Sequence, residues 1–375
     1  MITAADLLEG PRGRRFCTEL LRQVLDEDSR PAGRLRKVFF WAGYHLDRAR
    51  GESGTLFGPG ADHPEPAPGD DRVAAALGAA VDTVDPSTVR PVHVLRALAD
   101  AATFARYWQE PDAEDLILVL PAVAPVLARL ADLWAGTPAV AATVAVSDSG
   151  QQWGTVFDGP FGPEPHRDTD PGTAERLLSG WRRDLQQEVE AVRPRDLHGP
   201  VDALHGGEWW STPPSGLLVT SAAVPDLGPL TLWAVEDDMG WERAVVTPVV
   251  ARPDPRVLVV DGPDDWDGCC RRWPVDVSGT TRRHDWHHTT GRDGAWITPD
   301  WSGVAEEYDA VRITVRGWLR AAGRAIPVGA DVASVIAGWT PGSTVWLRDP
   351  VPVLKPSRSV AMIFDRDDLG WHPVA

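Results

Sequence analysis

The chain has 375 residues, 43% of them hydrophobic, and carries 37 basic against 54 acidic side chains, a formal charge of −17 at pH 7. This length and apolar content suffice for one large core or two ordinary ones, so we expect a folded protein, with two domains favoured. The acidic excess repels a phosphate backbone and argues against general binding to DNA or RNA, although a local basic patch could still hold one nucleotide.

Cysteine content and hydropathy indicate in which cellular compartment the protein is expected. Three cysteines are too few for a disulfide framework and fit a reducing cytoplasm. The N-terminal segment lacks the charged-then-apolar order of a signal peptide. The longest apolar run, residues 116–128, is shorter than the roughly 20 residues that span a bilayer. It contains prolines, so we expect a buried, kinked helix and no membrane segment. The low lysine content resembles that of proteins encoded by GC-rich actinobacterial genomes, and it says nothing about mechanism.

Residues 1–137 show helical periodicity, which predicts an N-terminal helical bundle. Pro11 is well placed to open a helix, because proline at a first helical position loses no hydrogen bond. Asp112 is the expected N-cap of a helix whose first turn is acidic, as the helix dipole favours. Beyond the helix at Pro11, the expected helices cover residues 34–50, 71–84, 87–108 and 113–133.

From residue 138 to residue 375, β-branched runs separated by proline and glycine predict a second, mostly antiparallel α+β domain. Residues 173–192 interrupt it as a helix, because their apolar positions recur at helical spacing. Thirteen of the eighteen tryptophans follow His205, so this domain is expected to be tryptophan-rich. The expected strands cover residues 141–147, 153–157, 216–224, 230–235, 243–250, 256–260, 310–315, 333–339 and 343–348. Glu236 and Glu242 are interpreted as parts of a hairpin around residues 237–240.

Several enzyme classes lack their motifs in this chain. Neither GxGxxG nor GxxxxGK[ST] occurs, which argues against Rossmann and P-loop proteins. The nucleophile elbow GxSxG and the metal patterns CxxC and HExxH are also missing, so a bound metal is not expected.

Residues 281–318 hold the densest group of titratable and aromatic side chains, beginning with RRHDWHH. The imidazoles could converge on a metal, although their spacing is not diagnostic, or the segment could be a solvated loop. We favour an Arg/His-rich polar loop that binds a nucleotide or another small anion, because guanidinium groups clamp phosphates and carboxylates. The candidate cofactor-binding residues there are Arg282, Arg283, His284 and Trp286.

Two further segments carry candidate catalytic residues. Glu306 and Glu307 lie on an expected short helix that leads into a strand, where a carboxylate can be aimed into a cleft or can simply face solvent. Residues 204–216 place His205, Ser211 and Thr212 beside paired glycines and tryptophans. Trp210 is a candidate cofactor contact, and the alternative is that both tryptophans are core or interface residues.

Taken in order, a His-Gly strand, a Ser-Thr strand and a late carboxylate make residues 195–350 resemble ADP-ribosyltransferase-like domains, which split NAD between nicotinamide and ribose. The resemblance implies NAD as cofactor. It assigns nucleotide contact to His205, the nicotinamide pocket to Ser211 or Thr212, and stabilisation of an oxocarbenium-like ribose to Glu306 or Glu307. The chain departs from the family in its short His205–Ser211 spacing and in lacking a Gln/Glu-x-Glu element.

Three function classes stay open. They are an NAD-consuming transferase, a non-enzymatic protein whose helical half supplies a partner surface, and a small-molecule enzyme centred on residues 282–292. We take the first as the working hypothesis. It expects residues 282–307 to form one wall of the site and residues 205–212 to form the other.

Overall fold

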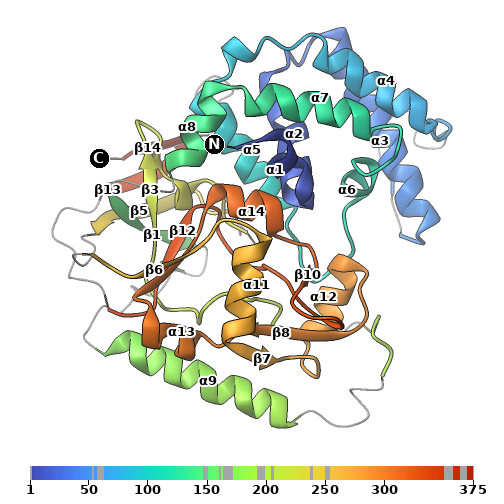
Figure 1. The fold of residues 1–375 in the computed structure, drawn as a ribbon. Helices are drawn as coiled ribbons and strands as arrows, with labels where there is room; N and C mark the ends of the chain where they lie inside the picture. Colours follow the sequence, from blue (N-terminus) through green and yellow to red (C-terminus); the bar gives the residue numbers. More distant parts are fainter. Residues whose placement is uncertain are drawn as a thin grey trace.

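The computed structural model describes residues 2–52, 55–56, 63–146, 151–159, 162–163, 172–191, 199–203, 207–236, 240–249, 254–349, 358–363 and 370–374. The fold is α+β, as predicted, with an N-terminal helical region and a large, mostly antiparallel sheet (Figure 1). The N-terminal helices lie at one end of the molecule, and the long helix α9 (Thr173–Ala191) runs along the opposite end.

Local sequence explains where the N-terminal helices begin. The side chain of Thr3 caps α1 in a capping box with Asp6. Pro11 is the first residue of α2, and Asp112 caps α6 by accepting from the backbone N–H of Glu114, as predicted. The elements of this region are α1 (Ala4–Glu9), α2 (Pro11–Val24), α3 (Arg30–Ala49), α4 (Asp70–Val81), η1 (Pro86–Thr88), α5 (Pro91–Thr103), α6 (Ala113–Ile117), α7 (Ala124–Ala135) and α8 (Pro138–Val146).

Three predicted elements are wrong. Residues 116–128 are not one kinked helix, because α6 ends at Ile117 and α7 begins at Ala124, with Leu120 restricted by the following proline. Of the predicted strand 141–147, residues 141–146 are the end of α8 and residue 147 lies outside the described residues. Short apolar runs fit a buried strand and a buried helix equally well. The predicted strand 230–235 contains the 3-10 helix η2 (Leu230–Leu232).

The large sheet has the strand order β14-β13-β5-β1-β3-β12-β9-β6, and only the pair β6 and β9 is parallel along this path. The short strands β2 and β4 pair with β1 and β3. The strands are β1 (Gln152–Gly159), β2 (Gly162–Pro163), β3 (Val219–Val224), β4 (Gly228–Pro229), β5 (Arg243–Val249), β6 (Val257–Val260), β9 (Ala310–Ile313), β12 (Ser343–Trp346), β13 (Arg358–Ile363) and β14 (Gly370–Pro373).

A smaller sheet, in the order β10-β11-β8-β7, packs against α11 beside a tryptophan-rich core. Trp266, Trp301 and Trp339 are fully buried there and contact one another through their rings. The elements are β7 (Pro274–Asp276), β8 (Ala295–Pro299), β10 (Ile326–Pro327), β11 (Val332–Ser334), α11 (Pro263–Arg272), α12 (Arg282–Thr290), α13 (Trp301–Glu307) and α14 (Val315–Ala321).

The helical region docks on the rest of the fold where α1 and α2 meet α14. Glycine permits the close approach, because a Cβ at Gly10 would lie 2.4 Å from the backbone oxygen of Arg320. The Arg320 side chain in turn forms an ion pair with Glu9, with 2.7 Å between Nε and Oε2. The N-terminal helices α1 and α2 therefore pack directly against α14.

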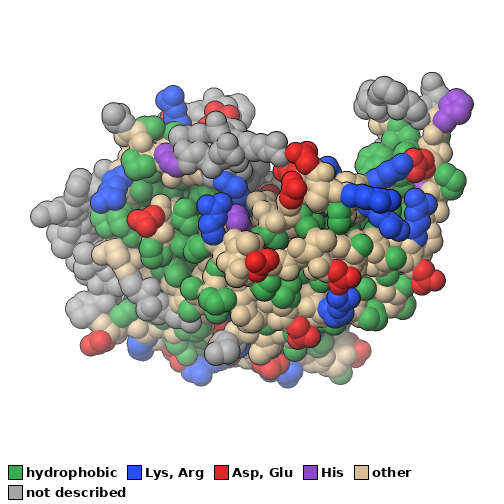
Figure 2. All heavy atoms as spheres, turned by 90° about the horizontal axis from the view of Figure 1, so that it is seen from above, with side chains coloured by type: hydrophobic (Ala, Val, Ile, Leu, Met, Phe, Trp, Pro, Cys, Tyr) green, Lys and Arg blue, Asp and Glu red, His purple; other side chains and the backbone are tan. Residues whose placement is uncertain are grey.

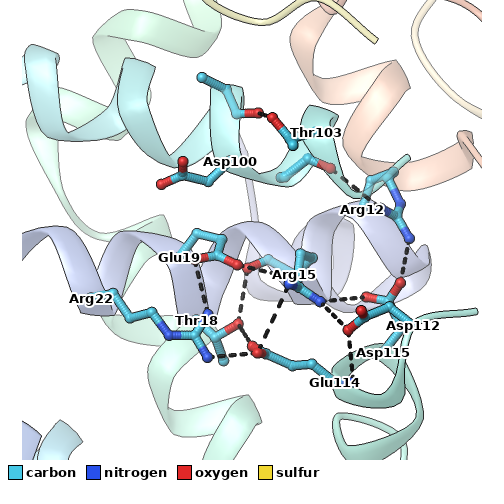
Figure 3. A network of polar contacts seen from close by, with 12 residues as sticks. Arg12, Arg15, Thr18, Glu19, Arg22, Asp100, Thr103, Asp112, Glu114 and Asp115 are labelled. Carbon is cyan, nitrogen blue, oxygen red and sulfur yellow. Dashed lines mark hydrogen bonds and ion pairs between the residues drawn. The ribbon is translucent and has the colours of Figure 1, made fainter. Parts of the chain in front are cut away.

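A buried ionic network fixes α2 against the segment that contains α6 (Figure 3). Arg12 and Asp115 form a buried pair, with 2.6 Å between Nη2 and Oδ2. Arg15 bonds Glu19 at 2.7 Å and Asp112 at 2.9 Å. Removing one member of such a pair leaves an uncompensated buried charge. The packing of α2 against residues 112–115 therefore depends on these pairs remaining intact.

Candidate functional site

A cavity of about 660 Å³ lies against the large sheet, within the size range of small-molecule sites. Strands β1, β3 and β12 contribute to its lining. The other described lining residues belong to three further parts of the chain: residues 208, 210 and 212–217; residues 231, 235, 236 and 241; and residues 338–340. Segments far apart in the chain therefore converge on one concave surface.

Aromatic rings form much of the cavity wall. Trp241 stacks on Phe157, with ring centroids 4.7 Å apart and an interplanar angle of 14°. Trp210 is 40% exposed and stacks on Trp209 at 4.7 Å. Gly338 packs directly against the Trp210 ring: its φ is +82°, and an added Cβ would lie 2.3 Å from Cδ1. The position of Trp210 therefore depends on the absence of a side chain at residue 338.

The polar part of the lining consists of hydroxyl and carboxyl groups. Thr155 and Thr231 share a hydrogen bond of 2.8 Å between their hydroxyls, and Ser343 donates to the backbone oxygen of Thr340 at 2.6 Å. The carboxyl groups belong to Glu208 and Glu236. No lysine, arginine or histidine belongs to the described lining of this cavity. The described lining consequently offers no cation to neutralise an anionic ligand.

Glu236 is buried beside the cavity, and two side chains donate hydrogen bonds to one of its oxygens. Its Oε1 accepts from the Tyr107 hydroxyl at 2.5 Å and from the Trp318 indole N–H at 2.6 Å. Its Oε2 has no hydrogen bond within the described structure. The two donors come from the end of the α5 region and from α14, so both halves of the chain position this carboxyl group.

Burial raises the pKa of Glu236 to about 8, because a charged carboxylate is poorly solvated there. The hydrogen bonds from Tyr107 and Trp318 oppose this effect, as does the backbone N–H of Gly338. Burial, followed by the nearby Glu236, also raises the pKa of Tyr107 well above its ordinary value. At neutral pH both groups are therefore protonated, and Glu236 is a neutral carboxylic acid that can donate a proton or a hydrogen bond.

Glu208 lies where this cavity meets a second one of about 550 Å³ that extends along α9. Both cavities are lined by Glu208, Pro214 and Ser215. Arg282 holds Glu208 in an ion pair of 3.0 Å between Nη2 and Oε1, and it also contacts Glu188 of α9 at 3.3 Å. The buried guanidinium of Arg282 thus orients the half-exposed side chain of Glu208.

The segment RRHDWHH is the helix α12, and the predicted polar loop is wrong at this position. Its candidate cofactor contacts are turned into the fold, with Arg282, His284 and Trp286 buried. Their polar groups contact the backbone of residues 199–210 instead: Arg282 Nε to Trp210 O at 3.0 Å, Arg283 Nη2 to Gly199 O at 3.2 Å, His284 Nδ1 to Val201 O at 2.9 Å, and Trp286 Nε1 to Trp209 O at 2.8 Å. The helix α12 therefore braces the chain that carries Trp210 and Glu208.

The other predicted site residues are dispersed. Thr212 lines the cavity beside Trp210. Ser211 is buried and bonds the backbone of Ala337, accepting from its N–H at 2.9 Å. His205 lies outside the described residues.

The predicted carboxylates lie apart from both cavities. Glu306 is exposed on α13, and neither Glu306 nor Glu307 belongs to the described lining. Glu307 forms an ion pair with the exposed Arg272. Of the two glutamates in the described lining, Glu236 was interpreted from the sequence as part of a hairpin. An acidic residue directly after the apolar run Leu230–Val235 was the available signal.

In the described part of the chain, no three or more His, Cys, Asp or Glu residues are grouped to hold a metal ion. None of the helices described there is long and apolar enough to cross a membrane. On the face seen from above in Figure 2, acidic and basic side chains both occur. Comparison of the chain with protein-family models, curated proteins and solved structures finds no match. The evidence about function therefore comes from the geometry of the cavity.

Proposed function

We propose that the protein binds a neutral saccharide or a similar polar ring compound in the cavity beside Glu236. The observation that carries the proposal is the combination in one cavity of aromatic walls, hydroxyl groups and a buried neutral carboxyl, with no cation among the described lining residues. The volume of about 660 Å³ accommodates a small molecule of this kind.

Each part of a saccharide has a matching surface. The indoles of Trp210 and Trp241 line the cavity and offer apolar surface to the C–H groups of a sugar ring. The carboxylate of Glu208 and the hydroxyls of Thr212 and Ser215 offer hydrogen bonds to sugar hydroxyls. A phosphorylated ligand would instead have to desolvate its charge beside two carboxyl groups, with no cation in the described lining, which is costly.

The test is a panel of neutral mono- and disaccharides together with their phosphorylated counterparts, screened by thermal shift and then by isothermal titration calorimetry. We expect neutral compounds to bind and phosphorylated ones not to bind. Trp210→Ala should weaken binding at least tenfold by removing a wall of the cavity, whereas Phe40→Ala, at an exposed aromatic of α3, should not. Binding of only the phosphorylated compounds, or of none, would contradict the proposal.

ADP-ribosyl transfer from NAD is the second candidate. Thr212, which the resemblance assigns to a nicotinamide pocket, and Trp210, the candidate cofactor contact, line the same cavity. It requires the pyrophosphate of NAD to bind where the described lining has no cation. Incubation with NAD and detection of released nicotinamide tests this candidate. Release that is lost in Thr212→Ala would favour it over saccharide binding.

A further inference from the structure

One face of α9 forms a wall of the second cavity. Four of the lining side chains follow one another at three- or four-residue spacing, which places them on one helical face: Leu177, Trp181, Asp184 and Glu188. Trp181 supplies aromatic surface, and the exposed carboxylate of Asp184 supplies hydrogen-bond acceptors. This wall therefore pairs an indole with polar groups, as the wall at Trp210 and Glu208 does in the cavity beside Glu236.

Contacts outside the cavity hold α9 in place. At its start, the backbone N–H groups of Gly172 and Ala174 donate to the carboxylate of Asp349 at 2.6 Å and 2.9 Å. Further along, the hydroxyl of Ser302 in α13 donates to the backbone oxygen of Leu178 at 3.2 Å. The wall made by α9 is therefore formed before any ligand binds.

Arg282 joins this wall to the segment that carries Trp210. Its Nη1 contacts Glu188 of α9 at 3.3 Å, its Nη2 contacts Glu208 at 3.0 Å, and its Nε donates to the backbone oxygen of Trp210 at 3.0 Å. Each nitrogen of the buried guanidinium thus has a partner within the protein. Arg282 consequently fixes the two cavities relative to each other.

The two cavities meet at an exposed junction. Glu208, Pro214 and Ser215 belong to the lining of both. The side chain of Glu208 is 48% exposed and Ser215 is exposed, so a ligand atom can contact either from solvent. Each cavity alone lies within the range of about 300–1,000 Å³ that holds one small molecule. The two together therefore have room for a longer ligand than either would hold.

We propose that the two cavities are consecutive subsites of one groove that binds a linear, neutral oligosaccharide. One sugar ring lies at Trp210, a further ring lies at Trp181, and the hydroxyls between them bond Glu208 and Ser215. Arg282 is a positioning residue, because it acts on the ligand through the walls that it joins. The inference rests on the proposed function and deepens it by stating that the ligand is a chain of sugar units.

The charges of the second cavity favour a neutral chain over an anionic one. Among its described lining residues, the carboxylates of Asp184, Glu188 and Glu208 outnumber the guanidinium groups of Arg176 and Arg282. Carboxylates accept hydrogen bonds from sugar hydroxyls and repel the carboxylates of an acidic polysaccharide. A chain of uronic acid units should therefore bind more weakly than a neutral chain of the same length.

The experiment measures affinity against chain length by isothermal titration calorimetry on the full chain. The probes are the linear oligomers, from one to six units, of the neutral sugar that binds most tightly in the panel. For glucose these are the α-1,4-linked and β-1,4-linked oligomers. Affinity should rise with length until both cavities are filled, by about tenfold for the ring that reaches Trp181, and should then stay constant.

Two substitutions on α9 close or strip the second cavity alone. Gly180 lines it, and an added Cβ would meet nothing closer than the Arg183 side chain at 3.8 Å, so Gly180→Leu fills the cavity without a clash in the fold. It should abolish the gain with length and leave the affinity of the shortest binding saccharide unchanged, whereas Gly180→Ala should keep most of the gain. Trp181→Ala should also abolish the gain, and Val189→Ala, at an exposed position of α9, is its control. Trp210→Ala should weaken binding at every length.

The outcomes separate this inference from the proposed function. Affinity that does not change with length in the unsubstituted protein would overturn the inference and leave the proposed function intact. A gain with length that survives in Gly180→Leu or in Trp181→Ala would do the same. Absence of binding at every length would instead remove the proposed function. Because the length series uses the unsubstituted protein, the first outcome does not depend on any variant folding.

Discussion

Replacing Glu236 by glutamine should remove a pH dependence of stability that the buried carboxyl imposes on the folded protein. In the fold the pKa rises from its ordinary 4.5 to about 8. Between these two values the unfolded chain has lost the proton and the folded protein retains it. The free energy of unfolding therefore decreases as the pH rises through this window and is constant above it. At about 1.4 kcal/mol for each pH unit, the total loss is up to about 5 kcal/mol.

Glutamine keeps an oxygen that accepts from Tyr107 and Trp318 but cannot ionise. Near pH 4.5 the two proteins should be about equally stable, and at pH 8.5 the glutamine variant should be more stable by up to about 5 kcal/mol. Urea unfolding followed by tryptophan fluorescence from pH 4.5 to pH 9 measures the difference. Asp100, whose pKa burial raises to about 6, contributes equally to both proteins and cancels. Parallel stability curves over this range would refute the reasoning.

Two further substitutions test the cavity and its support. Gly338→Ala should displace Trp210 and weaken saccharide binding at least tenfold in calorimetry, because the new Cβ would lie 2.3 Å from the indole. Gly329→Ala, whose Cβ would meet nothing closer than 3.9 Å, is the control, and equal affinity of both variants would contradict the packing argument. Asp115→Ala should lower the free energy of unfolding by about 3–5 kcal/mol, because the guanidinium of Arg12 loses its buried partner. Urea unfolding checks it, and a loss below about 1 kcal/mol would show that water or another group neutralises the charge.

The sequence predicted the fold class and the helices that have strong local signals. Pro11 and Asp112 mark helix starts through effects confined to neighbouring residues, and both were confirmed. The segments 116–128 and 141–146 were predicted wrongly, because a short apolar run is compatible with several buried elements. The conformation of such a run depends on the residues it packs against, which are far away in the sequence.

The candidate site was predicted less well, for the same reason. Trp210 and Thr212 were singled out and do line the cavity. Glu236 was missed because its properties depend on Tyr107 and Trp318, which are 129 and 82 positions away in the sequence. The polar groups of Arg282 and its neighbours in α12 were expected to contact a ligand, but they bond the backbone of residues 199–210. Composition alone does not distinguish a polar group that binds a ligand from one that braces the fold.

The most direct measurement is a crystal structure of the protein soaked at pH 6.5 with the tightest-binding neutral saccharide of the panel. We predict density for a sugar ring in the cavity beside Glu236, in contact with Trp210. Density for the saccharide at the surface of α12 or α13, with the cavity beside Glu236 empty, would contradict the proposed site.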